Sequence, residues 1–155
     1  MKLKIAVLPG DGIGPEVTNQ SIKVLNCIAD KYNHKVELTE GLVGAIAIDE
    51  YNDPYPDSTH MLCKDSDAIL FGAIGHPKYD NDPKAKVRPE QGLLKMRKKL
   101  GLFANLRPTI IFESLLEMSP IKEERIKDTD ILFVRELTGG IYFGERGRKD
   151  NDNYA

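Results

Sequence analysis

The chain has 155 residues, of which 41% are apolar, 30% charged and 7% aromatic, which is the length of one ordinary domain and the composition of a soluble globular protein rather than a disordered or fibrous one. Its 22 basic and 24 acidic residues give a net charge of −2, so there is no overall basic field to hold nucleic acid. Because no apolar run approaches the roughly 20 residues that span a bilayer, we expect a cytoplasmic protein with no membrane segment.

Strands and helices alternate in the pattern of the first half of the chain. The expected strands are Leu3 to Leu8, Lys35 to Thr39 and Ala68 to Ile74, and the expected helices are Pro15 to about Asp30 and Pro56 to Lys64. The first helix carries an apolar stripe made of Val17, Val24, Leu25 and Ile28, and Asp57 or Ser58 is the expected cap of the second. The third strand is almost continuously apolar, as strands covered on both faces are, so we expect a parallel α/β sheet.

A long polar loop and a further helix follow this sheet. The segment from His76 to Glu90 has three prolines and no period, and long loops after a strand of such a sheet are often functional. The pattern of the segment from Glu90 to Leu100 predicts a helix, which ends at Gly101. The remaining expected strands are Phe103 to Arg107, ended by Pro108, the buried run Ile131 to Val134, and Ile141 to Phe143.

Three glycines between the first strand and the first helix suggest a dinucleotide-binding turn. Gly10, Gly12 and Gly14 would let backbone amides approach a phosphate at the positive end of the helix. However, the third glycine is one position short of the GxGxxG spacing, and Pro15 removes an amide donor at the helix start. A plain tight turn is therefore the favoured interpretation.

One face of the helix from Glu90 carries charged and aliphatic side chains together. Glu90, Leu93, Leu94 and Arg97 share this face, and Met96 and Leu100 form a neighbouring stripe that can contact the core. Such a face can hold a ligand with an anionic head and a branched aliphatic tail. The alternative, which spacing alone favours, is an ordinary amphipathic helix with a charged surface.

Two further arginines and a tyrosine are candidate site residues. Arg107 and Arg135 each stand at the end of an expected strand, so with Arg97 they could converge on a di- or tricarboxylate. The alternative is a separate salt bridge for each arginine. Tyr142 lies in an apolar segment, where a phenol either donates a proton or packs. The basic cluster at 95–99 is more simply a solvated helix face than a nucleic-acid patch.

The histidines and cysteines give no sign of a metal centre or a catalytic triad. His34, His60 and His76 have no carboxylate or cysteine partner at helical spacing. Cys27 and Cys63 form no CxxC pair, so we expect neither a disulfide framework nor a zinc site, and both are most simply small core residues.

Four strings of the sequence are together similar to a known enzyme family. They are VLPGDGIGPEV, FGAIGHPKYD, VRPEQGLLKMRKKLGLFANLRP and VRELTGGIYFGE, in register from Lys4 to about Glu145. The chain thereby resembles the isopropylmalate branch of the isocitrate/isopropylmalate family of β-decarboxylating dehydrogenases. The resemblance implies that family's two-domain α/β fold, which is not a Rossmann fold and is incomplete in this chain. Residues 1–100 would be the N-terminal part of a first domain, and residues 101–155 the start of a second domain and dimer arm.

The activity that this resemblance implies is the NAD-dependent oxidation and decarboxylation of 3-isopropylmalate to 2-oxoisocaproate in leucine biosynthesis, with Mg²⁺ or Mn²⁺. The family's metal-ligand aspartates, general-base lysine and adenosine loop would lie beyond Ala155, so we expect no metal ligand in these 155 residues. Full-length members are homodimers with shared active sites. The isolated chain is therefore expected to be inactive.

The resemblance also assigns roles by position. Arg97, Arg107 and Arg135 match the substrate-carboxylate arginines, Tyr142 matches the catalytic tyrosine, and Leu93 and Leu94 match the residues that pack the isopropyl group. The loop from His76 to Glu90 matches the segment that faces the nicotinamide half of the cofactor. Its candidate cofactor-binding residues are His76, Pro77, Lys78 and Tyr79, and Glu90 matches its direct contact. The family commonly has Gly at position 76 and Trp at position 79, where this chain has His and Tyr.

Two other functions remain open. One is another enzyme of the same family, acting on isocitrate, homoisocitrate or tartrate, although isocitrate-using relatives place small polar residues on the helix that carries Leu93. The other is a non-catalytic module that binds carboxylates or nucleotides through the same arginines.

Overall fold

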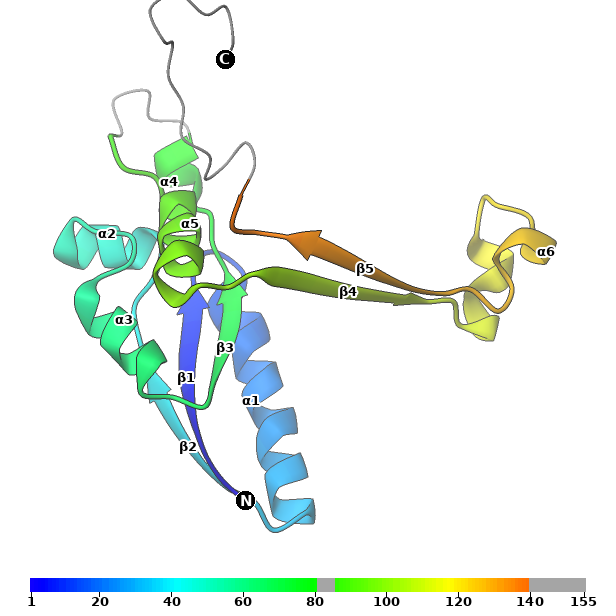
Figure 1. Ribbon diagram of the computed structural model, residues 1–155, viewed down its shortest axis with the longest axis horizontal. Coiled ribbons are helices and arrows are strands. Elements are labelled where there is room, and N and C mark those ends of the chain that lie inside the picture. The colour runs from blue at the N-terminus through cyan, green and yellow to red at the C-terminus, as the bar shows by residue number, and fades with distance from the viewer. Residues whose placement is uncertain (81–85, 140–155) are drawn as a thin grey trace, which may run out of the picture. The chain divides into compact units, whose positions relative to one another are not determined.

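The computed structural model describes residues 1–80 and 86–139, which belong to two compact units (Figure 1). Unit 1 is Met1–Leu100, and unit 2 begins at Gly101. Tyr142 and the strand expected at 141–143 lie outside the described residues. Among the helices that are described, none is long and apolar enough to cross a membrane.

A parallel three-stranded sheet with the order β2-β1-β3 forms the centre of unit 1. Its strands are β1 (Lys2–Gly10), β2 (Lys35–Glu40) and β3 (Ala68–Ala73). The middle strand is buried at four successive residues, Ile5 to Leu8, as expected for a strand with neighbours on both sides and layers on both faces. The expected parallel sheet is thus confirmed. In contrast to the expectation, β3 is only half-buried, because in the described chain it pairs with β1 alone.

Among the described residues of unit 1, five helices accompany this sheet. They are α1 (Gly14–Lys31), α2 (Ala45–Tyr51), α3 (Asp57–Lys64), α4 (Pro77–Asp80) and α5 (Pro89–Leu100). Helix α1 covers one face of the sheet, and α3 and α5 lie over the other (Figure 1). On that second side, a core cluster joins β1 to α3 and α5, and consists of Ala6, Leu8, Val43, Tyr55, Cys63 and Met96.

Helix α1 contacts the sheet through a face that the apolar stripe did not predict. Its buried residues are Gly14, Thr18 and Ala29, whereas Val17, Val24 and Ile28 are exposed and Leu25 is half-buried. Small side chains on the inner face allow the helix backbone to approach the sheet closely. The expectation for Cys27 is also wrong, since Cys27 is exposed on this helix, while Cys63 is buried as expected.

Two short helices of unit 1, α2 and α4, lie in segments where the sequence predicted no helix. Helix α3 begins as expected, but its N-cap is Pro56 and no side chain caps it, so the expected cap at Asp57 or Ser58 is wrong. Helix α5 is confirmed, and Gly101 follows it in the left-handed conformation at φ +64°.

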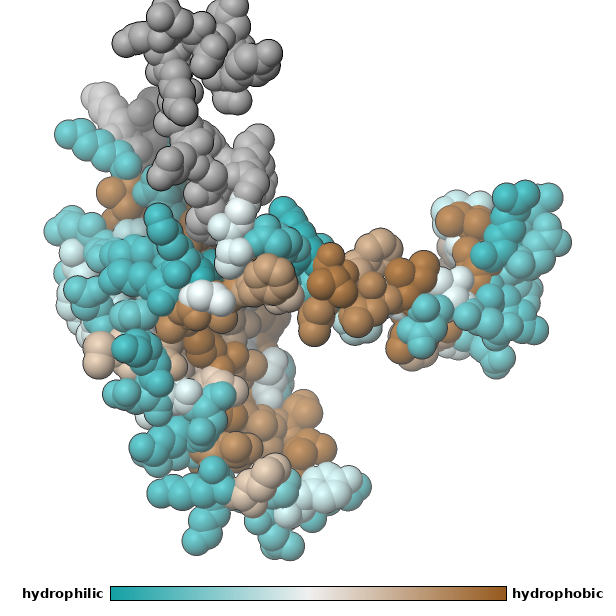
Figure 2. Space-filling view, viewed as in Figure 1, coloured by the Kyte–Doolittle hydropathy of each residue, from teal (hydrophilic) through white to brown (hydrophobic). Residues whose placement is uncertain are grey.

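Unit 2 is built on an antiparallel pair of strands, β4 (Ala104–Ile110) and β5 (Asp130–Glu136), joined through η1 (Glu113–Met118) and α6 (Glu123–Ile126). Strand β4 continues through Pro108, which lies opposite Leu132, so the expected end at Pro108 is wrong. Since β4 has one neighbour among the described residues, the missing amide of a proline need not break the ladder. The run from Ile131 to Val134 is exposed, not buried as expected. The surface of the two-stranded β4–β5 ribbon is largely apolar in Figure 2.

Candidate functional site

The turn after β1 uses its backbone groups within the protein. The amide of Asp11 donates to the carbonyl of Ala73 at 2.7 Å, and the amide of Gly14 donates to the carbonyl of Asp11 at 2.8 Å. Gly10 has φ +73°, and a Cβ there would lie 2.0 Å from the Ala73 oxygen. The glycines therefore permit close contact between the ends of β1 and β3, which confirms the plain-turn interpretation.

The carboxylate of Asp11, in the same turn, caps helix α2 from a distant position in the chain. It is buried and accepts hydrogen bonds from the amides of Ala45 at 2.7 Å and Ile46 at 3.2 Å. The same side chain also accepts from the amide of Gly75 at 3.4 Å. One carboxylate thus joins the β1 turn, the start of α2 and the segment after β3, and stabilises the positive end of the helix.

The four residues of the expected cofactor-facing segment lie directly after β3. Pro77, Lys78 and Tyr79 belong to α4, and the His76 carbonyl accepts from the amide of Tyr79 at 2.9 Å. The ammonium of Lys78 lies 2.5 Å from Asp49 Oδ1 on α2, and the Tyr79 hydroxyl donates to the same oxygen at 2.6 Å. These hydrogen bonds lower the pKa of Asp49 and raise the pKa values of Lys78 and Tyr79.

Glu90, the fifth expected cofactor residue, lies beside the start of this segment. Its Oε1 is 3.5 Å from the position that a Cβ on Gly75 would take, and Gly75 itself has φ +136°, a conformation that favours glycine. The structure therefore brings the carboxylate of Glu90 close to the segment that begins at His76. Carboxylate, imidazole and phenol groups can form hydrogen bonds with the amide and hydroxyl groups of a nicotinamide riboside. The polar groups of this segment therefore fit the implied cofactor.

Helix α5 packs on the core cluster of unit 1 through the neighbouring stripe that the sequence predicted. Met96 is buried in the core cluster, and Leu100 packs against that cluster. Leu93 also packs against it, whereas Leu94 and Arg97 are half-buried and Glu90 is exposed.

Two lysines of α5 pair with aspartates in the loop before α3 and at the first residue of α3. Lys95 Nζ lies 2.5 Å from Asp53 and Lys99 Nζ 2.6 Å from Asp57, so part of the basic cluster forms ion pairs within the protein. This pairing supports the helix-face interpretation of the cluster over the nucleic-acid patch. The ion pairs also hold the helix that carries Leu93, Leu94 and Arg97 at two points one turn apart.

Arg107 and Arg135 lie on one face of the unit 2 ribbon. Arg107 is opposite Phe133 and Arg135 is opposite Asn105, which makes the two arginines diagonal neighbours across the strands. Arg107 Nε donates to Asn105 Oδ1 at 2.9 Å. Within residues 1–80 and 86–139 none of the three candidate arginines forms an ion pair, and Glu136 accepts instead from the amides of Thr138 and Gly139. Because Arg97 belongs to unit 1, the convergence of all three arginines stays a prediction.

The described part of the chain has no group of three His, Cys, Asp or Glu side chains that could hold a metal ion. The family resemblance places the metal ligands beyond Ala155, and Ala155 itself lies outside the described residues. The position of the metal ligands in the full-length protein therefore stays a prediction.

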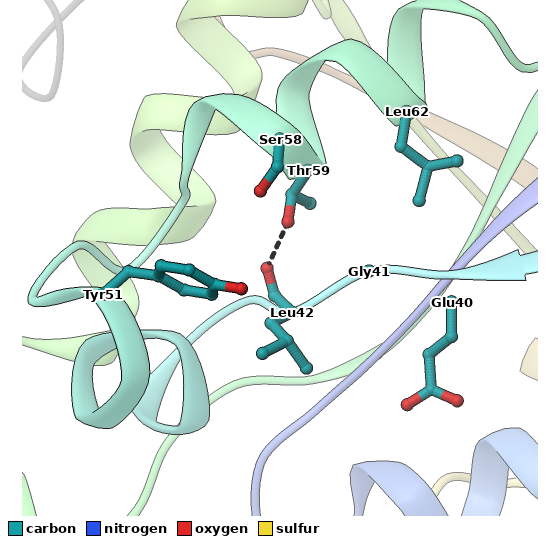
Figure 3. Close-up of a pocket in the computed structure, with 7 residues that line it drawn as sticks. All are labelled: Glu40, Gly41, Leu42, Tyr51, Ser58, Thr59 and Leu62. Carbon is teal, nitrogen blue, oxygen red and sulfur yellow. Dashed lines mark hydrogen bonds between the residues drawn. The ribbon is translucent and has the colours of Figure 1, made fainter.

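Unit 1 contains cavities lined by residues that the structure describes. One, of about 160 Å³, lies between the end of β2 and α3, and the Thr59 hydroxyl on its wall donates to the Leu42 carbonyl (Figure 3). Another lies beside the β1 turn, and its lining includes Pro9, Glu40 and Ile46. Neither of these cavities is lined by a residue that the resemblance assigns to substrate or cofactor, although Gly10 of the glycine turn lines the second.

Asp11, Asp49 and helix α2 were missed by sequence reasoning. Asp11 was visible within the glycine turn, but a turn motif does not tell which distant amides its carboxylate meets. Asp49 lies in the Ala45–Tyr51 segment, which is too short for a helical period to be recognised.

The sequence also matches known proteins. The family described as isocitrate/isopropylmalate dehydrogenase matches residues 4–155. The 3-isopropylmalate dehydrogenase of Bacteroides fragilis is 55% identical over 152 residues, which are 98% of this chain and 43% of that protein. The corresponding enzyme of Bacillus subtilis is 53% identical over 149 residues, which are 96% of this chain and 40% of that protein. The chain thus spans about two fifths of the length of these relatives.

Solved structures agree with this match. A β-decarboxylating dehydrogenase from Thermococcus kodakarensis aligns with 86% of this chain and 33% of its own, with a TM-score of 0.62 and 30% identity. An isocitrate dehydrogenase from Methylococcus capsulatus aligns with 97% of this chain and 40% of its own, with a TM-score of 0.67 and 26% identity. The expected fold class is confirmed, and the chain belongs to the isocitrate/isopropylmalate dehydrogenase family.

Proposed function

We propose that this chain is part of a cytoplasmic, homodimeric 3-isopropylmalate dehydrogenase that acts with NAD and Mg²⁺ or Mn²⁺ in leucine biosynthesis. The identity of 55% to an enzyme of that name supports the activity. The observation that carries the choice of substrate is the face of α5, where Leu93 and Leu94 stand beside Arg97 on one helix. An aliphatic substrate branch fits the two leucines, and a carboxylate fits the guanidinium. Units 1 and 2 would be parts of the first and second domains.

The chain's own residues would bind and orient the two reactants. Arg97, Arg107 and Arg135 would neutralise the substrate carboxylates, and Tyr142 would donate a proton to the enolate that remains when carbon dioxide leaves. The segment 76–79 and Glu90 would hold the nicotinamide half of the cofactor. NAD, when bound, accepts the hydride, and the divalent metal polarises the substrate hydroxyl.

The activity is tested by following NADH formation from isopropylmalate, NAD and Mg²⁺ with the full-length enzyme that carries this chain. We expect turnover by the full-length enzyme and none by the isolated 155-residue chain, since the lysine base and metal ligands that the family uses would lie beyond Ala155. NADH formation by the isolated chain would contradict this division of the site.

The choice of substrate is tested at Leu94. Leu94→Ser in the full-length enzyme should lower kcat/KM for isopropylmalate by about tenfold or more, because burial of the isopropyl group is lost, while Leu94→Ile should keep most of it. Leu94 is better suited than Leu93, which also packs against the core. If Leu94→Ser leaves activity with the native substrate intact, an isocitrate-, homoisocitrate- or tartrate-using enzyme is favoured instead.

The non-catalytic alternative is tested by calorimetry. Isopropylmalate binding that Arg107→Ala abolishes, without activity in any full-length form, would favour a carboxylate-binding module over the enzyme.

A further inference from the structure

The residues from His76 to Tyr79 are largely open to solvent in the described part of the chain. His76, Pro77 and Lys78 are exposed and Tyr79 is half-buried. The helix has four residues, far fewer than a helix needs to be stable on its own in water. The conformation of this segment must therefore depend on its polar contacts with neighbouring elements.

Those contacts meet at one oxygen atom of helix α2. Asp49 Oδ1 lies 2.5 Å from the ammonium of Lys78 and accepts the hydroxyl hydrogen bond of Tyr79 at 2.6 Å. The Lys78 ammonium also lies 5.3 Å from the centroid of the Tyr79 ring. An ammonium and a phenol from successive residues thus bind a single carboxylate, which sets the direction of both side chains.

Helix α2 is itself firmly placed, so it can act as a support. Ala45, Ala47 and Ile48 are buried, and the Asp11 carboxylate caps the first turn. The same carboxylate accepts from the amide of Gly75, the residue before His76. Two aspartates therefore connect α2 to the segment 75–79, Asp11 at its start and Asp49 at its helical part.

We propose that Asp49 is a positioning residue for the cofactor, which orients segment 76–79 on α2 through Lys78 and Tyr79 and so lowers the dissociation constant of NAD. The inference rests on the proposed function for the nature of the cofactor. It also depends on position 79, where a phenol hydroxyl reaches Asp49.

The test compares variants of the full-length enzyme by calorimetric NAD binding and by the separate KM values for NAD and isopropylmalate. Asp49→Ala should raise the Kd and KM for NAD about threefold to fivefold, a size typical of exposed charged contacts, and leave the KM for isopropylmalate within about twofold. Asp49→Asn should have a smaller effect, because an amide oxygen can still accept from Tyr79. As a single change, Tyr79→Phe should also weaken NAD binding. In the double variant with Asp49→Ala it should raise the Kd for NAD little further, because both changes remove the same contact.

Asp67→Ala is the matched control, since Asp67 also accepts a hydrogen bond, from the Lys4 amide at 2.8 Å, but lies next to the start of β3, at the opposite end of that strand from segment 76–79. It should leave NAD binding unchanged. An Asp49→Ala protein with an unchanged Kd for NAD overturns the inference, and Tyr79→Phe decides the matter in the same way if Asp49→Ala fails to fold. A wild-type protein that binds NAD without oxidising isopropylmalate contradicts the proposed function alone, and one that binds no NAD contradicts both.

Discussion

The two units bury their strands to very different degrees. In unit 1, β1 pairs on both sides and is covered by helices on both faces, and Leu8 is 0% exposed. In unit 2, β4 and β5 pair only with each other among the described residues, and Val134 is 63% exposed. Strands β1 and β5 both contain a short apolar run. An apolar run therefore predicts a strand, but layers on each face decide whether the strand is buried.

The largest expected effect comes from removing one side chain in each unit. Leu8→Ala should lower the free energy of unfolding by about 3 kcal/mol, because it leaves a cavity in the core cluster. Val134→Ala in the isolated chain should cost less than about 1 kcal/mol, because the side chain is already in solvent. Urea unfolding followed by circular dichroism measures both. Equal losses would show that the ribbon is covered in solution, and would contradict the comparison.

Carboxylates that accept backbone amides give the next effect. Asp11→Ala should cost about 1 to 2 kcal/mol, since it removes the cap of α2 and leaves buried amides without a partner. Glu136→Ala removes a similar pair of amide contacts, to Thr138 and Gly139, but on an exposed side chain. The same urea titration should show a clearly smaller loss for Glu136→Ala. A larger loss there would mean that burial is not what distinguishes the two turns.

The smallest expected effect depends on pH. Burial by itself raises the pKa of Asp53, but hydrogen bonds from Lys95 and from the Tyr55 amide outweigh it, so the pKa lies below 3.8. A carboxyl whose folded pKa is lowered contributes stability above its unfolded pKa and loses it as the pH falls through the folded value. Asp53→Asn should therefore cost under about 1 kcal/mol at pH 7, and nothing once the pH is well below 3.8. Urea midpoints of the two proteins at pH 7 and at acid pH check this, and a difference that persists in acid would contradict it.

Much of unit 1 was predictable because its signals are local. The strands from Leu3, Lys35 and Ala68, the helix after Pro15 and the end of α5 at Gly101 each follow from a few adjacent residues. The stripe of Val17, Val24 and Ile28 predicted a helix correctly but not which of its faces is buried. That face depends on how closely the helix backbone can approach the sheet, and here small residues such as Gly14 and Thr18 permit the contact.

In the candidate site, too, local features were predictable from the sequence and tertiary contacts were not. The sequence predicted which residues belong to it, since motifs around His76, Glu90 and Arg97 are recognisable without a structure. Tertiary structure alone decided how they are held: Asp11 binds amides 34 residues away in α2, and Asp49 binds Tyr79 from 30 residues away. Helices as short as α2 and α4 form only with such partners, because the cost of starting a helix exceeds what a few residues recover. The resemblance of a few motifs to a known family therefore predicted the chemistry proposed for this protein, while contacts between distant segments produced its geometry.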